Sequence, residues 1–352
     1  MIFKILTLLP VLSLLRCKAV CKSWKSIISD PHFIQAHLTI SHKKQPPFSH
    51  LRVVSQARLQ DFFIDTQGEN SIKLTLPDYM SGMYFYVHSC NDLVTLADIH
   101  MKSGVFYIWN PLTRLFKLIP KSNIFPEYPD VMIFNHIGLG FDSVSNDYKI
   151  FRLMMGISSF NDVKFTVMVA ELYSVKDDCW KEIRVPEEMQ DFHRDPFSRC
   201  VCVGSGVLYF QGLFKILSFD LHDKVFRFIE YPDSKERMSE VLDFDGSIAM
   251  ILKSGGEGAI LSLWKLDGVG GNSWTKMFNI QPDPEIDSVF LYLGDGQFLA
   301  EDSCGFRYFY YDDRKKGNLK RPPVAAPVFS IGTRVYQFSG SLVSLEGFVQ
   351  QE

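Results

Sequence analysis

The sequence predicts a mainly β protein: a β-propeller of about six blades, preceded by a small all-α module. One observation is a change of pattern near residue 45. Before it, apolar residues recur at helical spacing, and after it short runs rich in Val, Ile, Phe and Tyr alternate with Gly, Asp, Asn and Pro clusters. The other observation is a repeat of about 45 residues along the strand-rich part, a period typical of propeller blades.

The first 40 residues predict short helices. From Ser13 onward, apolar residues at three- and four-residue spacing predict one amphipathic helix capped by Ser13. Its apolar face comprises Cys17, Val20, Cys21, Trp24, Ile27 and Ile28. Asp30 followed by Pro31 is typical of a cap and a first helical residue, so a second helix is expected through Leu38. Residues 41–50 are polar and contain prolines, and they are expected to form a linker.

The apolar start of the chain also suggests a secretory signal or a membrane anchor. Pro10 interrupts the apolar run, and the basic residues Arg16 and Lys18 follow the run instead of preceding it. The run ends after about 15 residues, short of the roughly 20 that a membrane span needs. We therefore expect neither a signal peptide nor a membrane anchor.

Six segments of the strand-rich part align on one apolar or aromatic anchor residue each. The anchors are Ile64, Trp109, Tyr173, Phe219, Trp264 and Tyr310, at intervals of 45, 64, 46, 45 and 46 residues. We attribute the long interval to a loop insertion around residues 121–134. Each unit is expected to hold two antiparallel strands and an outer aromatic residue, such as Phe116, Trp180, Phe226 or Trp274. A single blade cannot bury both faces of its sheet, so radial stacking is expected.

Closure of such a ring usually needs a strand from one end of the chain to complete a blade begun at the other end. The segment from Arg334 to Leu345 is expected to pair with the early strand at Leu51 to Val54. The propeller would then occupy residues 51–348.

Composition and charge exclude several kinds of partner. The formal net charge is only -3, which gives no electrostatic reason to expect nucleic acid or an anionic membrane as a partner. The seven cysteines are scattered and no two show CxxC spacing, which favours free thiols over disulfides or a zinc site. A reducing location, the cytoplasm and/or the nucleus, is expected.

No motif predicts catalysis, a cofactor or a metal. The glycines at 204–206 and 255–258 lack the spacing of phosphate-binding loops and are expected to be turns. His193 near Cys200 and Cys202 fits no zinc pattern. Asp142 lies in a sequence typical of a turn, where its carboxylate would bind backbone N–H groups. An enzyme with its site in the propeller channel is the weakest of the alternatives, because no nucleophile, base and orienting group stand at a recognisable spacing.

Four blocks near the start resemble the F-box motif of plant F-box proteins. They are Leu9-Pro10-Val11, Ser13-Leu14-Leu15-Arg16, Val20-Cys21-Lys22-Ser23-Trp24 and Ile28-Ser29-Asp30-Pro31-His32-Phe33. Relative to the family pattern, the motif is shortened at its N-terminal end, and it occupies residues 1–40.

The resemblance implies a partner, a Skp-type adaptor that links the chain to a cullin. The residues that it suggests for adaptor binding are Leu9, Pro10, Leu14, Leu15, Val20, Cys21 and Trp24. Any of them can instead pack the helices against one another or against the propeller, and this alternative stays open.

The rest of the chain, from about residue 50 to 345, resembles the F-box-associated interaction domain of the same proteins, which is similar to kelch-type propellers. The segments "IWNPLTRLFKLIP", "GLGFDSVSNDYKIFRL" and "AELYSVKDDCWKEI" carry this resemblance. It implies a non-catalytic subunit of a ubiquitin ligase that binds a target protein through propeller loops. The candidate loops are Lys121 to Asp130, Glu187 to Asp195 and Lys253 to Gly258. The alternative is a propeller scaffold that has lost adaptor binding and no longer joins a ligase.

Overall fold

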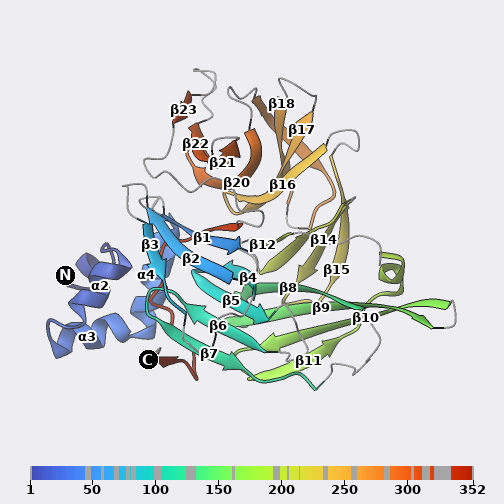
Figure 1. Ribbon diagram of the computed structural model, residues 1–352. Helices are drawn as coiled ribbons and strands as arrows, with labels where there is room; N and C mark the ends of the chain where they lie inside the picture. Colours follow the sequence, from blue (N-terminus) through green and yellow to red (C-terminus); the bar gives the residue numbers. More distant parts are fainter. Residues whose placement is uncertain are drawn as a thin grey trace.

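The computed structural model has a helical module at the N-terminus and a body of antiparallel sheets (Figure 1). It describes residues 2–43, 49–56, 59–66, 71–76, 80, 85–98, 105–123, 132–160, 163–192, 199–203, 206–213, 215–232, 237–254, 260–268, 270–280, 286–302, 305–310, 318–320 and 334–350. The architecture is mainly β with a small helical region, as the sequence predicted.

The helical module contains α1 (Ile2–Leu6), α2 (Val11–Cys17), α3 (Lys22–Ser29) and α4 (Pro31–Lys43). The prediction of one helix from Ser13 to Ile28 was wrong, because the chain breaks between α2 and α3. The N–H groups of Ala19 and Val20 bond to carbonyls three residues earlier, which tightens and ends α2, and Cys21 is extended with φ of -159°. Ser13 therefore lies inside α2, which starts after Pro10.

The second predicted helix start is confirmed. Oδ1 of Asp30 accepts hydrogen bonds from the N–H groups of His32 at 2.8 Å and Phe33 at 3.3 Å, and Pro31 is the first residue of α4. The helix continues to Lys43 and β1 begins at Ser49, so only part of the expected linker 41–50 separates them. Residues 44–48 of that linker lie outside the described residues.

The described strands form six antiparallel sheets. One contains β24 (Arg334–Gln337), β1 (Ser49–Gln56), β2 (Leu59–Thr66) and β3 (Ser71–Leu74). The next contains β4 (Phe85–Cys90), β5 (Leu93–Asp98), β6 (Phe106–Asn110) and β7 (Leu115–Ile119), with β25 (Val349–Gln350) at its outer edge. The third contains β8 (Met132–Asp142), β9 (Asp147–Phe160), β10 (Val163–Ser174) and β11 (Cys179–Ile183).

The remaining three sheets follow the same order. They contain β12 (Arg199–Val203), β13 (Val207–Gln211), β14 (Lys215–Asp220) and β15 (Phe226–Glu230); β16 (Arg237–Phe244), β17 (Ser247–Ser254), β18 (Ile260–Leu266) and β19 (Trp274–Ile280); and β20 (Ile286–Gly294), β21 (Gln297–Asp302), β22 (Gly305–Tyr310) and β23 (Asn318–Lys320). A 3₁₀ helix, η2 (Glu187–Phe192), follows β11.

Each anchor residue lies on the third strand of a different sheet: Ile64 on β2, Trp109 on β6, Tyr173 on β10, Phe219 on β14, Trp264 on β18 and Tyr310 on β22. Three predicted outer aromatics lie directly opposite their anchors on the fourth strand, in the pairs Trp109 with Phe116, Tyr173 with Trp180 and Phe219 with Phe226. The fourth predicted pair, Trp264 with Trp274, does not form. A register shift after Leu263 places Lys276 opposite Trp264 instead. The Lys276 ammonium lies 5.1 Å from the Trp264 ring centre, and Trp274 pairs with Leu266 instead.

The long interval between the second and third anchors has a different cause from the one expected. The strands β8, β9 and β10 contain 11, 14 and 12 residues, and the β9–β10 hairpin projects beyond the rest of its sheet in Figure 1. Long strands therefore account for much of the extra length that we assigned to a loop at residues 121–134. Residues 124–131 of that loop lie outside the described residues.

The predicted ring closure is confirmed. Strand β24 pairs antiparallel with β1, so that Leu51 lies opposite Tyr336 and Arg52 opposite Val335. After β24 the chain returns to the β4–β7 sheet, where Val349 of β25 pairs with Phe116 of β7.

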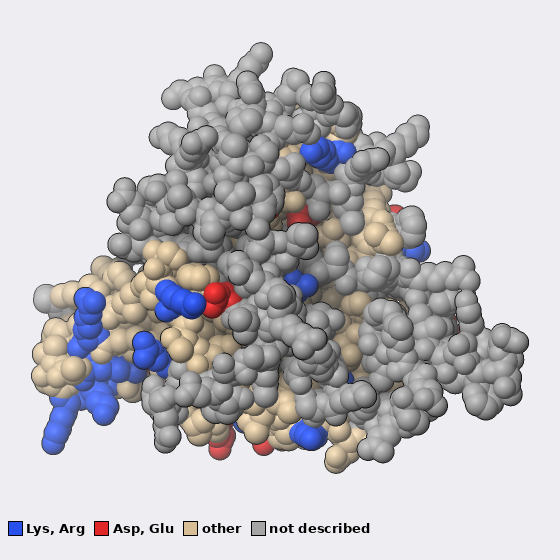
Figure 2. Space-filling view, in the orientation of Figure 1, with Lys and Arg blue, Asp and Glu red and all other residues tan. Residues whose placement is uncertain are grey.

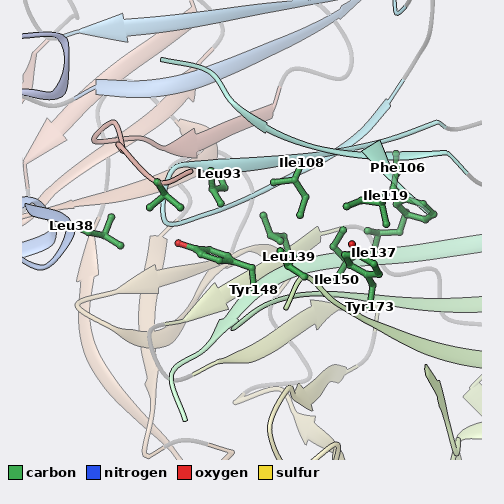
Figure 3. Packing of buried hydrophobic residues seen from close by; sticks show 13 residues of the cluster. Leu38, Leu93, Phe106, Ile108, Ile119, Ile137, Leu139, Tyr148, Ile150 and Tyr173 are labelled. Atoms are coloured by element: carbon green, nitrogen blue, oxygen red, sulfur yellow. The ribbon is translucent and has the colours of Figure 1, made fainter. Parts of the chain in front are cut away.

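A buried cluster joins the helical module to two neighbouring sheets (Figure 3). Leu38 of α4 belongs to the same apolar cluster as Leu93 and Ile108 of the β4–β7 sheet and Leu139 and Ile150 of the β8–β11 sheet. Burial of such side chains stabilises the fold by roughly 1.5–3 kcal/mol each. The helical module is thus packed onto the propeller body.

Candidate functional site

The helical module has a core of its own. Its buried residues are Leu6, Val11, Leu14, Ile28 and Phe33, together with Leu342 from the segment after β24. Leu112, in the turn between β6 and β7, packs against this core. The module is therefore held at the end of the body that carries the turn between the third and fourth strands.

One further contact holds the module together, and another joins it to the body. Nε2 of His37 on α4 lies 2.9 Å from the carbonyl oxygen of Leu9, which ties α4 to the α1–α2 connection. The segment after β24 passes beneath the module, where Gly340 has φ of 84°. A Cβ at Gly340 would lie 2.5 Å from Cδ1 of Leu112, so only glycine suits both the backbone and the space.

The seven residues suggested for adaptor binding fall into three groups. Pro10, Val20 and Cys21 are exposed. Leu9, Leu15 and Trp24 are partly buried against the module core. Leu14 is fully buried in that core, so this residue packs the helices and is not on the surface.

The structure adds exposed apolar residues that the sequence reasoning missed. Ile2, Ile5, Leu8 and Leu12 are 49%, 55%, 57% and 45% exposed, and Val20 is 65% exposed. We call these five residues the apolar surface of the module. For Ile2, Ile5 and Leu8 the signal in the sequence was the composition of residues 2–9, which are apolar except for Lys4 and Thr7 and include a helix too short to bury them all.

The helical module that carries this apolar surface is also strongly basic. The module carries Lys4, Arg16, Lys18, Lys22 and Lys25 between residues 2 and 30, against a single acidic residue, Asp30. Figure 2 shows a group of blue Lys and Arg side chains on the left of the molecule, where Figure 1 places the helices. Burial lowers the pKa of Lys18, and the nearby charge of Lys25 lowers it further. An apolar surface on a basic module suits a protein partner that offers apolar contact area and acidic side chains.

The two ends of the propeller body differ in their connections. Because the strands are antiparallel, the turns between first and second and between third and fourth strands share the end that carries the helical module. The longer connections between sheets, and those between second and third strands, lie at the opposite end. The three loops predicted to bind a target, at residues 121–130, 187–195 and 253–258, are all of the latter kinds. Only residues 121–123, 187–192 and 253–254 of them are described.

Asp142 serves the turn that the sequence predicted. Its Oδ1 accepts hydrogen bonds from the N–H groups of Val144 and Ser145, and its Oδ2 lies 2.7 Å from Nζ of Lys149. Burial raises the pKa of Asp142, but the hydrogen bonds from Lys149 and Ser145 outweigh burial and hold this pKa well below its usual value. A carboxylate held ionised in this way is not suited to act as a general acid.

The described residues contain no group of three or more His, Cys, Asp or Glu side chains placed to hold a metal. Cys200 and Cys202 lie on β12, and His193 falls outside the described residues. Among the helices that the structure describes, none has the length and apolar character needed to cross a membrane.

Comparison with known proteins finds one family for the helical module and another for the propeller body. Residues 38–321 match the family described as the F-box associated beta propeller domain, and residues 1–40 match the F-box-like family. The chain belongs to the F-box associated β-propeller family.

Relatives within this family are plant F-box proteins. F-box protein CPR1 of Arabidopsis thaliana is 26% identical over 308 residues, which cover 81% of this chain and 73% of the relative. F-box protein At5g49610 of the same plant is 27% identical, with coverage of 79% and 77%. Among solved structures, Porphyromonas gingivalis dipeptidyl peptidase 4 aligns at 10% identity with a TM-score of 0.42, over 77% of this chain and 44% of that one.

Proposed function

We propose that this F-box protein is the substrate-recognition subunit of a Skp-cullin-F-box ubiquitin ligase. Its helical module would bind a Skp-type adaptor and, through the adaptor, a cullin. The observation that carries the proposal is the apolar surface of the module, exposed at one end of a propeller whose opposite end holds the longer loops.

The mechanism is proximity without chemistry by this chain. A target held by the loops at one end would be presented to a ubiquitin-loaded enzyme that the cullin brings to the same complex. Holding two reactants in one assembly raises their effective concentration, which is the contribution of a receptor subunit. The protein would act in the cytoplasm or the nucleus, where such ligases and reduced thiols are found together.

Co-purification of the full chain with a Skp-type adaptor tests this function. Leu12→Asp and Val20→Asp should each reduce adaptor capture about tenfold or more, because a charge is then placed in an apolar contact. Met277→Asp is the matched control: Met277 is 44% exposed, close to the value for Leu12, but lies on the outer strand β19 and not in the module, and its variant should bind as the natural chain does. A folded natural chain that captures no adaptor would support the alternative, a propeller scaffold outside any ligase.

Target binding can be tested on the same preparations. We expect that Gly-Ser replacement of residues 187–195 or 253–258 removes a captured target while adaptor binding stays intact. Retention of the target by both replaced chains would contradict the assignment of these loops.

A further inference from the structure

Two cysteines from different sheets meet at the inner strands of the propeller. Cys90 is the last residue of β4 and Cys202 lies on β12, and their Sγ atoms are 3.8 Å apart. Strands β4 and β12 belong to sheets separated by the β8–β11 sheet, so the two thiols approach each other past the end of β8. At this distance the two thiols form a weak hydrogen bond and are not joined by a disulfide.

The thiols line a cavity of about 200 Å³. Its other walls come from the inner strands and include Phe141, Asp243, Tyr292 and Tyr336. A cavity of this size admits water and small solutes. Both sulfur atoms therefore have a route to a small oxidant and space in which to move.

Two glycines on β8 have no side chain where the thiols of β12 lie, and this leaves space for those thiols. A Cβ at Gly140 would lie 3.2 Å from Sγ of Cys202 and 2.4 Å from Cδ1 of Leu221. Gly138 stands in the same relation to Cys200, with its Cβ position 2.9 Å from that Sγ. Cys200 and Cys202 are two residues apart on one strand and so lie on the same face of it.

We propose that Cys90 and Cys202 are a redox-active pair that closes to a disulfide under a hydroperoxide oxidant. One thiolate attacks the peroxide oxygen to give a sulfenic acid, and the other thiol attacks that sulfur and expels water. With hydrogen peroxide, two thiols and one peroxide give one disulfide and two water molecules. The sulfur atoms, now 3.8 Å apart, must approach to about 2 Å for the bond to form.

The cysteine pair would be oxidised slowly. A hydrogen bond to Cys202 and burial both raise the pKa of the Cys90 thiol, so little thiolate is present and the pair stays reduced until an oxidant persists. Once formed, the disulfide would tie β4 to β12 and narrow the cavity between them. Oxidation would thereby fix the relative positions of three successive sheets at this end of the channel.

The test uses the full chain treated with hydrogen peroxide, alkylated and digested without reduction. Mass spectrometry should find the peptide of Cys90 joined to the peptide of Cys202. The unfolding midpoint should rise by roughly 5 °C and return to its starting value with dithiothreitol. Cys90→Ser and Cys202→Ser should each abolish both effects, and Cys90→Ala serves if a serine variant folds poorly.

Cys200→Ser is the matched control. Cys200 shares a strand, a face and a tryptic peptide with Cys202, so only the variant assigns the bond. The cross-link should persist in Cys200→Ser. Its loss in that variant, or alkylation of both Cys90 and Cys202 at a peroxide dose that has already oxidised the exposed Cys21, would overturn the proposal.

Discussion

Arg152 and Glu171 form an ion pair inside the β8–β11 sheet, with Nη1 of Arg152 3.0 Å from Oε1 of Glu171 and both side chains fully buried. Asn135 of β8 accepts a hydrogen bond from Nε of the arginine, and the hydroxyl of Ser122 donates to the glutamate. The guanidinium also lies 5.2 Å from the ring centre of Phe106 on β6. The pair thus joins two neighbouring sheets.

We predict that Glu171→Gln destabilises the protein by about 3–5 kcal/mol. The substitution leaves the arginine charge buried without its carboxylate, and this loss outweighs any gain from removing a buried acid. The free energy of unfolding in urea measures the effect. As a control, Asp177→Asn removes the exposed partner of Lys181 and should leave stability nearly unchanged, because solvent screens this pair. Equal effects of the two substitutions would contradict the importance of the buried pair.

Asp243 should make stability fall as pH rises. Burial raises its pKa to about 6, above the value in an unfolded chain, although the N–H of Gly246 donates a hydrogen bond to it. Between about pH 4 and 6 the folded protein therefore retains a proton that the unfolded chain has released.

The substitution Asp243→Asn removes this titration. The variant should gain about 1–2 kcal/mol over the natural chain when the pH is raised from 4 to 8. Urea unfolding at both pH values measures the difference. A stability difference that is the same at pH 4 and pH 8 would show that folding does not raise the pKa of Asp243.

Leu14 and Leu12 provide a test of core against surface within one helix. Leu14→Ala should destabilise the helical module by about 2–5 kcal/mol, because Leu14 is fully buried. Leu12→Ala should change stability by less than about 0.5 kcal/mol, because Leu12 is 45% exposed. Hydrogen exchange of the α2 and α3 amides distinguishes the two residues. Comparable protection in both variants would be incompatible with the packing described above.

Ring closure by β24 predicts the effect of a proline there. Val335 is buried and lies opposite Arg52 of β1, so Val335→Pro removes a side chain from the core and a donor from an inner strand. We expect a loss of about 3 kcal/mol or more and an expanded body in small-angle X-ray scattering. Ser344→Ala, at an exposed position after the strand, should leave both properties unchanged.

Much of the body could be predicted because each sheet repeats one pattern. The aromatic pair on the third and fourth strands, as in Trp109 with Phe116, recurs wherever a polar turn of constant length joins the two strands. The register shift at Trp264 escaped prediction because the repeats were aligned on their anchor and outer aromatic residues, which give no signal for an extra residue in one of the paired strands. The length of β9 and β10 was not predicted either. A longer hairpin and a longer loop lengthen the interval between two anchor residues equally, so the interval alone cannot distinguish them.

The helical module was harder to predict. The apolar spacing continues across residues 18–21 as if one helix ran through them. In the structure, backbone hydrogen bonds end α2 there, and the extended residue Cys21 precedes α3. The pattern also could not separate Leu14 from Leu12, because the core of the module is completed by Leu342, more than three hundred residues away. The exposed apolar surface therefore became visible only with the tertiary structure.

The pairing of β24 with β1 has a consequence for synthesis of the protein. While the ribosome makes residues 57 to 333, β1 lacks its inner neighbour, and its free N–H and C=O groups can pair with any other strand nearby. A chain that stops before Arg334 would keep that open edge for its whole lifetime. Nascent and truncated molecules of this protein should therefore depend on chaperones to a degree that the finished ring does not.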